Sequence, residues 1–208
     1  MSPEELRARY DEIRAEVGAG VTVVVATKYV SFEDMAALAE AGIAVVGENR
    51  AQDLAEKHAR YGDAFRWHFI GHLQSRKAKA VSEVCELVHS LDSDSAAQRL
   101  AVPALVQVNL SQEPTKSGIR PPDLEGFLER CPAEVRGLST MPPLTDDAEA
   151  SRPYFRSLRE LAGGLGLREL SMGTSQDYRI AVEEGATHVR VGSALWQGEE
   201  GVTLRPPD

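Results

Sequence analysis

The chain has little with which to form disulfides, bind metal or cross a membrane. Of its 208 residues only Cys85 and Cys131 are cysteines, and they lack metal-ligand spacing. No apolar run approaches the roughly 18 residues that a membrane span needs. The first residues, Met1-Ser2-Pro3-Glu4-Glu5, are acidic and carry no apolar signal segment. We therefore expect a cytoplasmic protein with reduced thiols.

Positive charge is scarce as well. The formal net charge is -9 and the isoelectric point is about 5.1. Sequence-independent binding to nucleic acid or to a membrane surface needs a concentrated cationic field, so we expect neither partner. Any anionic ligand must be held by a few local groups. At this length a single domain, residues 1–208, is the simplest organisation, and no repeat or linker divides it.

What the chain does contain is a regular alternation of short apolar runs and longer mixed segments. The runs predict strands at Val21–Thr27, Ala44–Gly47, Arg66–Ile70, Leu87–Ser90, Ala104–Asn109, Val135–Ser139, Glu169–Met172 and His188–Val191. Helical patterns fall at Ser2–Val17, Phe32–Ala41, Arg50–Tyr61, Ser75–Val84, Pro122–Arg130, Asp146–Leu161 and Gln176–Glu184. Several strands are apolar on both faces, as in parallel strands covered by helices. The pattern predicts an α/β fold, a single (β/α)8 TIM-type barrel, with an open doubly wound sheet as the alternative.

The ends of these segments carry their own signals. Ser2 is a predicted N-cap, with Pro3 at the first helical position and Glu5 completing a capping box. The stretch 163–166 reads as a helix stop, because it lacks the context of a phosphate loop. Residues 92–102 leave room for only a short helix, and residues 198–208 are too short and proline-rich for a full eighth one. We expect the opening helix to cover that gap.

In a barrel of this type the active site lies where the strands end and their loops begin. Those positions form a polar, glycine-rich set: Lys28, Glu48-Asn49, Gly71-His72-Leu73-Gln74, Asp92, Asn109, Ser139-Thr140-Met141, Gly173-Thr174-Ser175 and Gly192-Ser193. Ordinary turn formation explains any one member. A functional site at this end of the barrel explains the whole set better.

Lys28 is the candidate reactive group. It follows directly after the apolar run Val21–Thr27. An amine at the end of a buried strand can be partly desolvated, which favours the neutral nucleophile that forms Schiff bases with carbonyl compounds. A solvated surface lysine is the alternative.

The last two loops predict an anion site. Gly173-Thr174-Ser175 leads into a helix expected near Gln176, and barrels frequently bind phosphate with the loops after strands seven and eight. Ser175 serving only as a helix cap is the simpler reading. Gly192-Ser193 offers another hydroxyl beside bare backbone. Arg190 shares a strand face with Gly192, so it is expected to point into the barrel mouth or, alternatively, to bridge to a neighbouring strand's carboxylate.

An ordered set of motifs resembles a known family. The motifs are Val25-Ala26-Thr27-Lys28, Gly47-Glu48-Asn49, Trp67-His68-Phe69-Ile70-Gly71-His72-Leu73-Gln74, Val108-Asn109, Lys116-Ser117-Gly118-Ile119, Gly137-Leu138-Ser139-Thr140-Met141, Ser171-Met172-Gly173-Thr174-Ser175-Gln176-Asp177 and Gly185-Ala186-Thr187-His188-Val189-Arg190-Val191-Gly192. Together they are similar to the pyridoxal phosphate homeostasis protein family. The resemblance spans roughly residues 20–197.

The resemblance implies a fold, a cofactor and its contacts. The fold would be a barrel related to the N-terminal domain of alanine racemase, and Lys28 would hold pyridoxal 5'-phosphate (PLP) as a Schiff base. The implied phosphate contacts are Thr174, Ser175, Gly192 and Ser193, and the implied ring contacts are Asn49 and Arg190, with Arg190 at the pyridine nitrogen. Two positions depart from the family's usual pattern: Thr174 replaces a methionine and Arg76 replaces a common asparagine. Phosphate binding through the backbone should survive the first change.

The same residues bear on whether the protein is an enzyme. A cationic arginine at the pyridine nitrogen disfavours protonation there and so weakens the ring as an electron sink. Racemases of the related fold also use an arginine, but they add an acid/base group, usually a tyrosine from a second domain, which we do not expect here. Tyr29 is expected to face away from Lys28, and the remaining tyrosines lie in predicted helices: Tyr10, Tyr61, Tyr154 and Tyr178. His72 is the remaining proton-transfer candidate, although a structural histidine is the simpler reading.

We therefore expect a monomeric, non-enzymatic protein that buffers or delivers PLP in vitamin B6 homeostasis, with PLP-dependent apoenzymes as candidate partners. A PLP-dependent amino-acid racemase or lyase is one alternative. An aldolase-like barrel, whose lysine forms an imine with a sugar phosphate, is another.

Overall fold

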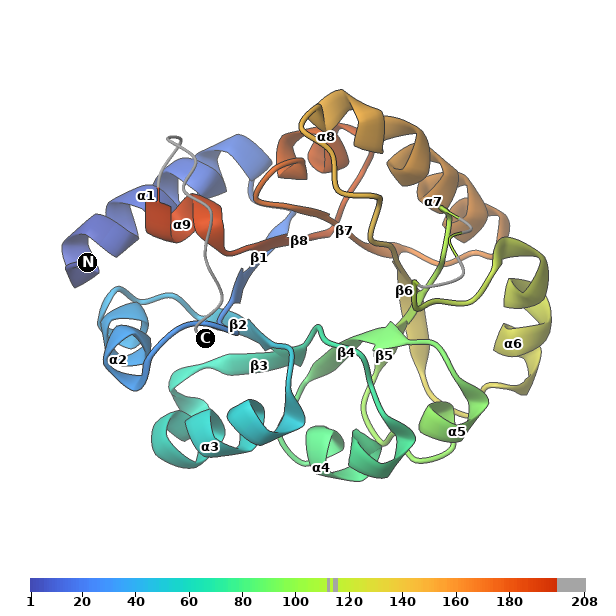
Figure 1. The fold of residues 1–208 in the computed structure, drawn as a ribbon, viewed down its shortest axis with the longest axis horizontal. Helices are drawn as coiled ribbons and strands as arrows, with labels where there is room; N and C mark the ends of the chain where they lie inside the picture. The colour runs from blue at the N-terminus through green and yellow to red at the C-terminus, as the bar shows by residue number, and fades with distance from the viewer. Residues whose placement is uncertain (112, 114–115, 198–208) are drawn as a thin grey trace.

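The fold is a closed barrel of eight parallel strands surrounded by helices, as Figure 1 shows in a view down the barrel. The computed structural model describes residues 1–111, 113 and 116–197. The strands are β1 (Thr22–Ala26), β2 (Val45–Glu48), β3 (Arg66–Phe69), β4 (Leu87–Leu91), β5 (Ala104–Gln107), β6 (Val135–Ser139), β7 (Glu169–Thr174) and β8 (His188–Val191). Each pairs with the next, and β8 pairs with β1, so the predicted barrel is confirmed over the open sheet.

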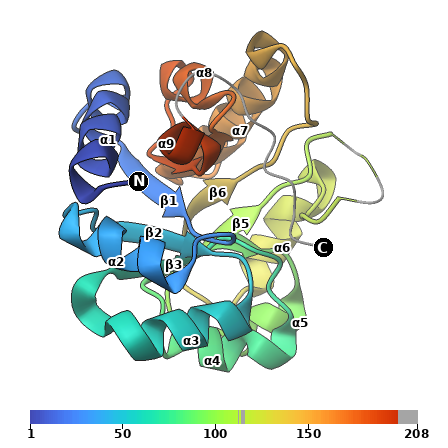
Figure 2. The same ribbon diagram turned by 60° about the vertical axis from the view of Figure 1, so that its left-hand side comes forward.

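Helices form the outer layer of the molecule (Figures 1 and 2). They are α1 (Pro3–Val17), α2 (Phe32–Glu40), α3 (Ala51–Tyr61), α4 (Ala78–Ser82), α5 (Asp94–Ala97), α6 (Leu124–Arg130), α7 (Arg152–Gly164), α8 (Tyr178–Glu183) and α9 (Ser193–Gln197), with 3-10 turns at Gly62–Ala64, Ser75–Lys77, Pro121–Asp123 and Ala148–Ser151. α1 packs against α2, α8 and α9, so the opening helix covers the outside of the barrel beside the short α9. The expectation for residues 198–208 lies outside the described residues.

Helix ends follow the sequence signals in some places and depart from them in others. The capping box of α1 is present: Ser2 Oγ accepts from Glu5 N, and Glu5 Oε2 accepts from Ser2 N. α7 ends at Gly164, as the glycine-rich stop predicts. The helix predicted from Gln176 instead begins at Tyr178, because residues 175–177 form a turn that closes with the Asp177 amide donating to the Thr174 carbonyl. The helices predicted from Ser75 and Asp146 begin with 3-10 turns.

Two strand ends differ from the prediction by two residues, and the others differ by one residue at most. β5 stops at Gln107, because Val108 leaves the barrel ladder and pairs with Ile119 in the following loop. β7 continues to Thr174, which pairs with Arg190 of β8. This extension brings the two loops of the predicted anion site side by side.

Apolar side chains fill the layer between strands and helices, whereas the barrel interior holds several polar groups. Val23 and Val25 of β1 and Phe127 of α6 are among the fully buried core residues. Inside the barrel, His68, His89 and His188 lie with ring centroids 5.0 to 6.1 Å apart. Barrel interiors are normally filled by branched aliphatic residues. The polar groups therefore need hydrogen-bond partners, which we describe below.

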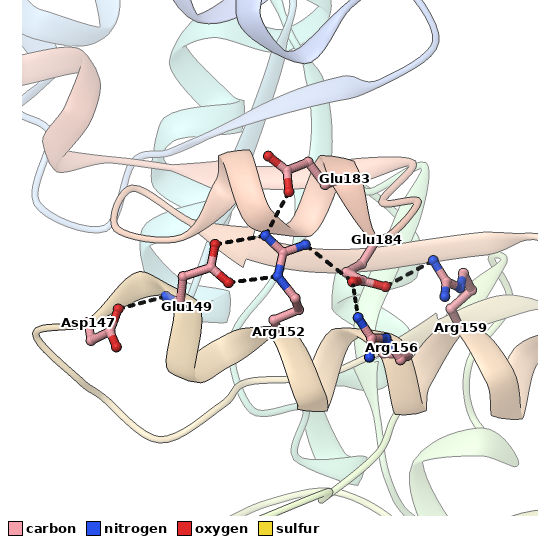
Figure 3. A network of polar contacts seen from close by, with 7 residues as sticks. All are labelled: Asp147, Glu149, Arg152, Arg156, Arg159, Glu183 and Glu184. Atoms are coloured by element: carbon pink, nitrogen blue, oxygen red, sulfur yellow. Dashed lines mark hydrogen bonds and ion pairs between the residues drawn. The ribbon is translucent and has the colours of Figure 1, made fainter.

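The outer edge of the barrel carries an ion cluster between α7 and α8 (Figure 3). Glu184, whose side chain is only 5% exposed, meets Arg152, Arg156 and Arg159 of α7 at 2.9 to 3.3 Å. Arg152 also pairs with Glu149 and Glu183, each at 2.7 Å. We call these six residues the Glu184 cluster. It ties two neighbouring helices together on the side of the loop that leads to β8.

The described ranges contain neither a membrane-spanning helix nor a metal-binding cluster. No helix in them combines the length and apolarity that a bilayer crossing requires. Their His, Cys, Asp and Glu side chains form no group suited to a metal ion.

Candidate functional site

A cavity of about 520 Å³ opens at the mouth of the barrel, where the strands end. All seven predicted site residues line it: Lys28, Asn49, Thr174, Ser175, Arg190, Gly192 and Ser193. They come from the ends of β7 and β8, from the loops after β1, β2, β7 and β8, and from the start of α9. The closure of β8 on β1 makes the first and last strands neighbours, so the lysine near the start of the chain and the loops near its end share one rim.

Lys28 lies two residues beyond the end of β1, in a turn, and is exposed. The burial that we expected for this amine is not found. Its Nζ lies 4.7 Å from the centroid of the Tyr29 ring, and Tyr29 also lines the cavity. The prediction that Tyr29 faces away was wrong, because side chains alternate only within a strand and β1 has already ended at Ala26.

A buried ion pair supports the backbone on both sides of the cavity. Glu48 is fully buried and Lys57 of α3 is 6% exposed. Lys57 Nζ donates to Glu48 Oε1 and, at 2.6 Å, to the carbonyl of Thr27. Thr27 Oγ1 donates to Glu48 Oε1 at 2.7 Å, and the Asn49 amide donates to Glu48 Oε2 at 3.1 Å. One carboxylate thus fixes the residue before Lys28 and the backbone of Asn49.

Gly71 explains how the backbone of Asn49 fits against the next strand. A Cβ at position 71 would lie 1.9 Å from the Asn49 carbonyl oxygen, so any side chain there would displace Asn49. Asn49 lines the cavity, and its side-chain Oδ1 is buried without a hydrogen-bond partner among the described residues. The backbone of Asn49 is therefore held in place, while its side-chain oxygen remains without a hydrogen-bond partner among the described residues.

In the loop after β7, Thr174 and Ser175 make hydrogen bonds that differ from the prediction. Thr174 N and Thr174 Oγ1 both donate to Asp177 Oδ1, at 2.7 and 3.1 Å, so the backbone donor expected at Thr174 is already paired. Ser175 does not cap α8. Instead its Oγ accepts from the amides of Gly192 at 3.0 Å and Ala194 at 3.1 Å. Two backbone donors of the last loop therefore converge on one oxygen position, and the Ser175 hydroxyl hydrogen remains to donate.

Gly192 leaves the approach to these donors open. A Cβ at position 192 would meet nothing nearer than the Ala26 Cβ at 3.7 Å, so the protein itself does not require glycine there. The space is instead free for a ligand to come close to the backbone.

Arg190 points into the barrel mouth, as strand alternation predicts. Its NH1 donates to Ser171 Oγ at 3.2 Å, and its NH2 donates to the Thr140 carbonyl at 2.8 Å and contacts Met141 Sδ at 2.9 Å. The alternative, an ion pair with a neighbouring strand's carboxylate, is absent from the ion pairs of the described residues. Burial lowers the pKa of Arg190 to about 10, opposed by the charge of Asp177. The guanidinium therefore stays cationic at neutral pH, with its Nε buried and unpartnered among the described residues.

Three buried polar atoms without described partners gather on the wall of this cavity. They are Asn49 Oδ1, Arg190 Nε and Trp196 Nε1. A buried polar atom without a partner costs about 1–3 kcal/mol, so such atoms are rare unless something else satisfies them. Arg190 and Trp196 each keep a donor, and Asn49 an acceptor, that no described residue uses. Trp196 was missed from the sequence, because no predicted helix or strand includes it.

His72, the proton-transfer candidate, lies away from the cavity walls. It is exposed, and its Nδ1 lies 3.6 Å from Asp92 Oδ2. Burial raises the pKa of Asp92, while the charge of His72 acts in the opposite direction. His72 Nδ1 also lies 3.5 Å from Ser117 Oγ, so the histidine has partners, as the structural reading expects, although its side chain is 59% exposed.

Comparison with known proteins gives a consistent result. Residues 1–200 match the model of the alanine racemase N-terminal domain family. A pyridoxal phosphate homeostasis protein of Aquifex aeolicus is 41% identical over 175 residues, covering 74% of this chain and 77% of that protein. One from Deinococcus radiodurans is 39% identical over 211 residues, covering 94% and 100%. The structure of PipY from Synechococcus elongatus with PLP bound superposes with a TM-score of 0.84 at 32% identity, covering 91% of this chain and 99% of that one.

Proposed function

The chain belongs to the pyridoxal phosphate homeostasis protein family, and from this premise we propose that it binds PLP at the barrel mouth and buffers or delivers it. One observation supports this assignment above the others. One cavity is lined by the amine of Lys28, by Ser175, whose oxygen accepts from two backbone amides, and by three residues that each keep an unpartnered polar atom. PLP carries an aldehyde, a phosphate and a polar ring, which match these three groups in kind.

We assign each group of the cofactor to residues of matching chemistry. Lys28 would hold the aldehyde as a Schiff base. Ser175 Oγ–H would donate to the phosphate, and the amides of Gly192 and Ala194, which donate to Ser175 Oγ, would hold that hydroxyl in place, with Ser193 beside them. Arg190 Nε–H would donate to the pyridine nitrogen, and Asn49 and Trp196 would line the ring. Because its donors are already paired with Asp177, Thr174 would contribute the wall of the phosphate site rather than a direct hydrogen bond.

We propose a carrier rather than a catalyst. PLP supplies an electron-withdrawing ring, which works best when the pyridine nitrogen is protonated. A cationic Arg190 next to that nitrogen opposes a second positive charge and can only donate hydrogen bonds. The site residues thus favour holding the cofactor over activating it.

A PLP-dependent racemase or lyase remains a second candidate because of one observation. Tyr29 lines the cavity beside Lys28, where it has the position of a proton donor. Solvent deuterium at Cα of an amino acid, incorporated faster than with free PLP and lost in Tyr29→Phe, would establish this enzyme. A carrier predicts no incorporation above free PLP in either protein.

The test of PLP binding is the visible spectrum of the purified protein followed by borohydride reduction. We expect an imine band and, after reduction, a PLP label on the peptide that contains Lys28. Lys28→Ala should lose both, and the matched surface variant Lys79→Ala should keep both. Wild-type protein without bound PLP, or a label that persists in Lys28→Ala, would overturn the proposal. An aldolase that acts on sugar phosphates would show no chromophore, so the same spectrum separates it.

We further propose a single-domain monomer in the cytoplasm, with PLP-dependent apoenzymes as recipients. Support comes from the single barrel that the described residues form and from the free thiols of Cys85 and Cys131. Burial raises the pKa of Cys85 to about 12, which keeps this thiol protonated and unreactive. Sedimentation and transfer of PLP to a purified apoenzyme would test the two parts.

A further inference from the structure

A series of hydrogen bonds crosses the barrel interior and ends at Arg190. Arg190 NH1 lies 3.2 Å from Ser171 Oγ, Ser171 Oγ lies 2.7 Å from His89 Nδ1, and His89 Nε2 lies 2.9 Å from His68 Nδ1. These four residues come from β8, β7, β4 and β3. We call them the barrel series. Each member is at most 8% exposed, and Ser171 is fully buried.

The chemistry of Arg190 fixes the direction of the first bond, and we assign the directions of the other two from it. A guanidinium has no acceptor, so Ser171 Oγ must accept from it. The Ser171 hydroxyl hydrogen is then available to His89 Nδ1, which accepts. With Nδ1 unprotonated, neutral His89 carries its hydrogen on Nε2 and donates it to His68 Nδ1.

The surroundings favour the neutral form of both histidines that this direction requires. Burial lowers the pKa of His68 to about 3 and holds the pKa of His89 well below its usual value, and the charges of nearby His188 and Arg190 act in the same sense on His89. Neither ring is expected to carry a second proton at neutral pH. Because each donor in the series polarises the next, His89 strengthens Ser171 as an acceptor for Arg190.

We propose that Ser171 and His89 are positioning residues that hold the Arg190 guanidinium toward the cofactor ring. The proposal rests on the proposed PLP site. Ser171 and the Thr140 carbonyl fix the two terminal nitrogens of Arg190 and leave Nε for the ligand. His89 acts through Ser171, and His68 acts as the acceptor that fixes the tautomer of His89. No member other than Arg190 needs to contact PLP.

Two substitutions at position 89 separate this role from packing. Asn places its amide group near the position of Nδ1 and can still accept from Ser171, whereas Gln reaches the position of Nε2 and can contact only His68. We expect His89→Asn to bind PLP within about threefold of the wild type. His89→Gln and Ser171→Ala should each weaken binding about tenfold, the effect of one lost hydrogen bond to a charged group.

A matched control and a spectroscopic signature complete the test. Ser139 is as deeply buried as Ser171, and its hydroxyl bonds the His89 carbonyl instead of the ring. Ser139→Ala should leave both PLP affinity and the induced circular dichroism of the bound cofactor unchanged, while Ser171→Ala and His89→Gln should alter that dichroism. Equal effects of His89→Asn and His89→Gln, or of Ser171→Ala and Ser139→Ala, would overturn the positioning role. Urea unfolding of each variant checks that it folds.

A measurement on the wild type needs no variant and no cofactor. Nitrogen-15 chemical shifts should show His89 protonated at Nε2 and unprotonated at Nδ1 at neutral pH. A proton on Nδ1 would overturn the direction of the series. If the wild type binds no PLP, the proposed function fails, and these shifts still decide whether the barrel series exists as described.

Discussion

Charged and polar side chains gather in two parts of the molecule that keep them in different ways. Beneath the cavity, Glu48 has one cationic partner, Lys57, and both are buried. At the outer edge, Glu184 has three cationic partners, and two of these, Arg156 and Arg159, are about half exposed. If Lys57 is lost, Glu48 keeps no cationic partner among the described residues. If one of the three arginines is lost, Glu184 keeps two (Figure 3). The same type of interaction therefore supports the site in one place and only fastens helices in the other.

The largest expected difference between the barrel interior and the Glu184 cluster is in how acid changes their contribution to stability. Burial lowers the pKa of His68 to about 3 and that of His188 to about 4, from an ordinary value of 6.5. The unfolded chain takes up these protons as the pH falls below 6.5, and the folded chain does not. The free energy of unfolding should therefore fall between pH 8 and pH 5 by about 2 kcal/mol for each of these histidines, and His89, whose pKa burial also lowers, adds to the fall in the same direction. Urea unfolding across this range measures the loss.

The Glu184 cluster should lose its contribution to stability only at lower pH. Hydrogen bonding from Arg156 lowers the pKa of Glu184 from 4.5, so its contribution is complete above that pH and is lost only below it. Asp92 acts in the opposite direction to the histidines, because its raised pKa lets the folded chain take up a proton first. His188→Gln should remove about 2 kcal/mol of the expected loss, and an unchanged profile in that variant would contradict the assignment.

Lys57→Met carries the next largest expected effect. It leaves the Glu48 carboxylate buried without a cation, which typically costs about 3–5 kcal/mol of unfolding free energy. PLP affinity should fall as well, since Glu48 also holds the backbone at Thr27 and Asn49. Adding Glu48→Gln to Lys57→Met should recover part of the stability. A Lys57→Met protein as stable as the wild type would show that the pair is not structurally important.

Glu184→Gln should cost less, about 1–2 kcal/mol at neutral pH, because water reaches two of the three arginines that lose their partner. PLP affinity should remain within about twofold of the wild type. Chemical unfolding and a PLP titration on the same preparation measure both. A loss of affinity comparable to that of Lys57→Met would erase the distinction between the two parts.

Arg156→Ala should have the smallest effect, under about 1 kcal/mol, because Arg152 and Arg159 still meet Glu184. The small loss should shrink further as salt is added, since half-exposed pairs are screened. Arg156→Lys, which keeps the charge, is the control. A salt-independent loss of several kcal/mol would mean that the cluster is cooperative rather than redundant.

Much of the architecture follows from local sequence signals. The strand and helix order, the capping box at Ser2 and the inward direction of Arg190 depend on short-range periodicity, and the structure agrees with all three. The set of residues around the cavity could be predicted because the ends of parallel strands always meet at one rim.

The remaining features depend on contacts between distant segments. Tyr29 turned toward the cavity because alternation stops with the strand. The pairing of Lys57 with Glu48 requires the register of α3 against the sheet, which no local pattern fixes. Ser171, His89 and His68 lie on three different strands and meet only across the closed barrel. Asp177 satisfies the Thr174 amide through a turn that shortened the predicted helix.

The pairing of β1 with β8 also bears on how the protein is made. Lys28 leaves the ribosome early, while Ser175, Arg190 and Gly192 belong to the last strands to be synthesised. A nascent or truncated polypeptide that stops before β8 has the amine but lacks the opposite wall. The proposed cofactor site is therefore complete only after β8 has been synthesised.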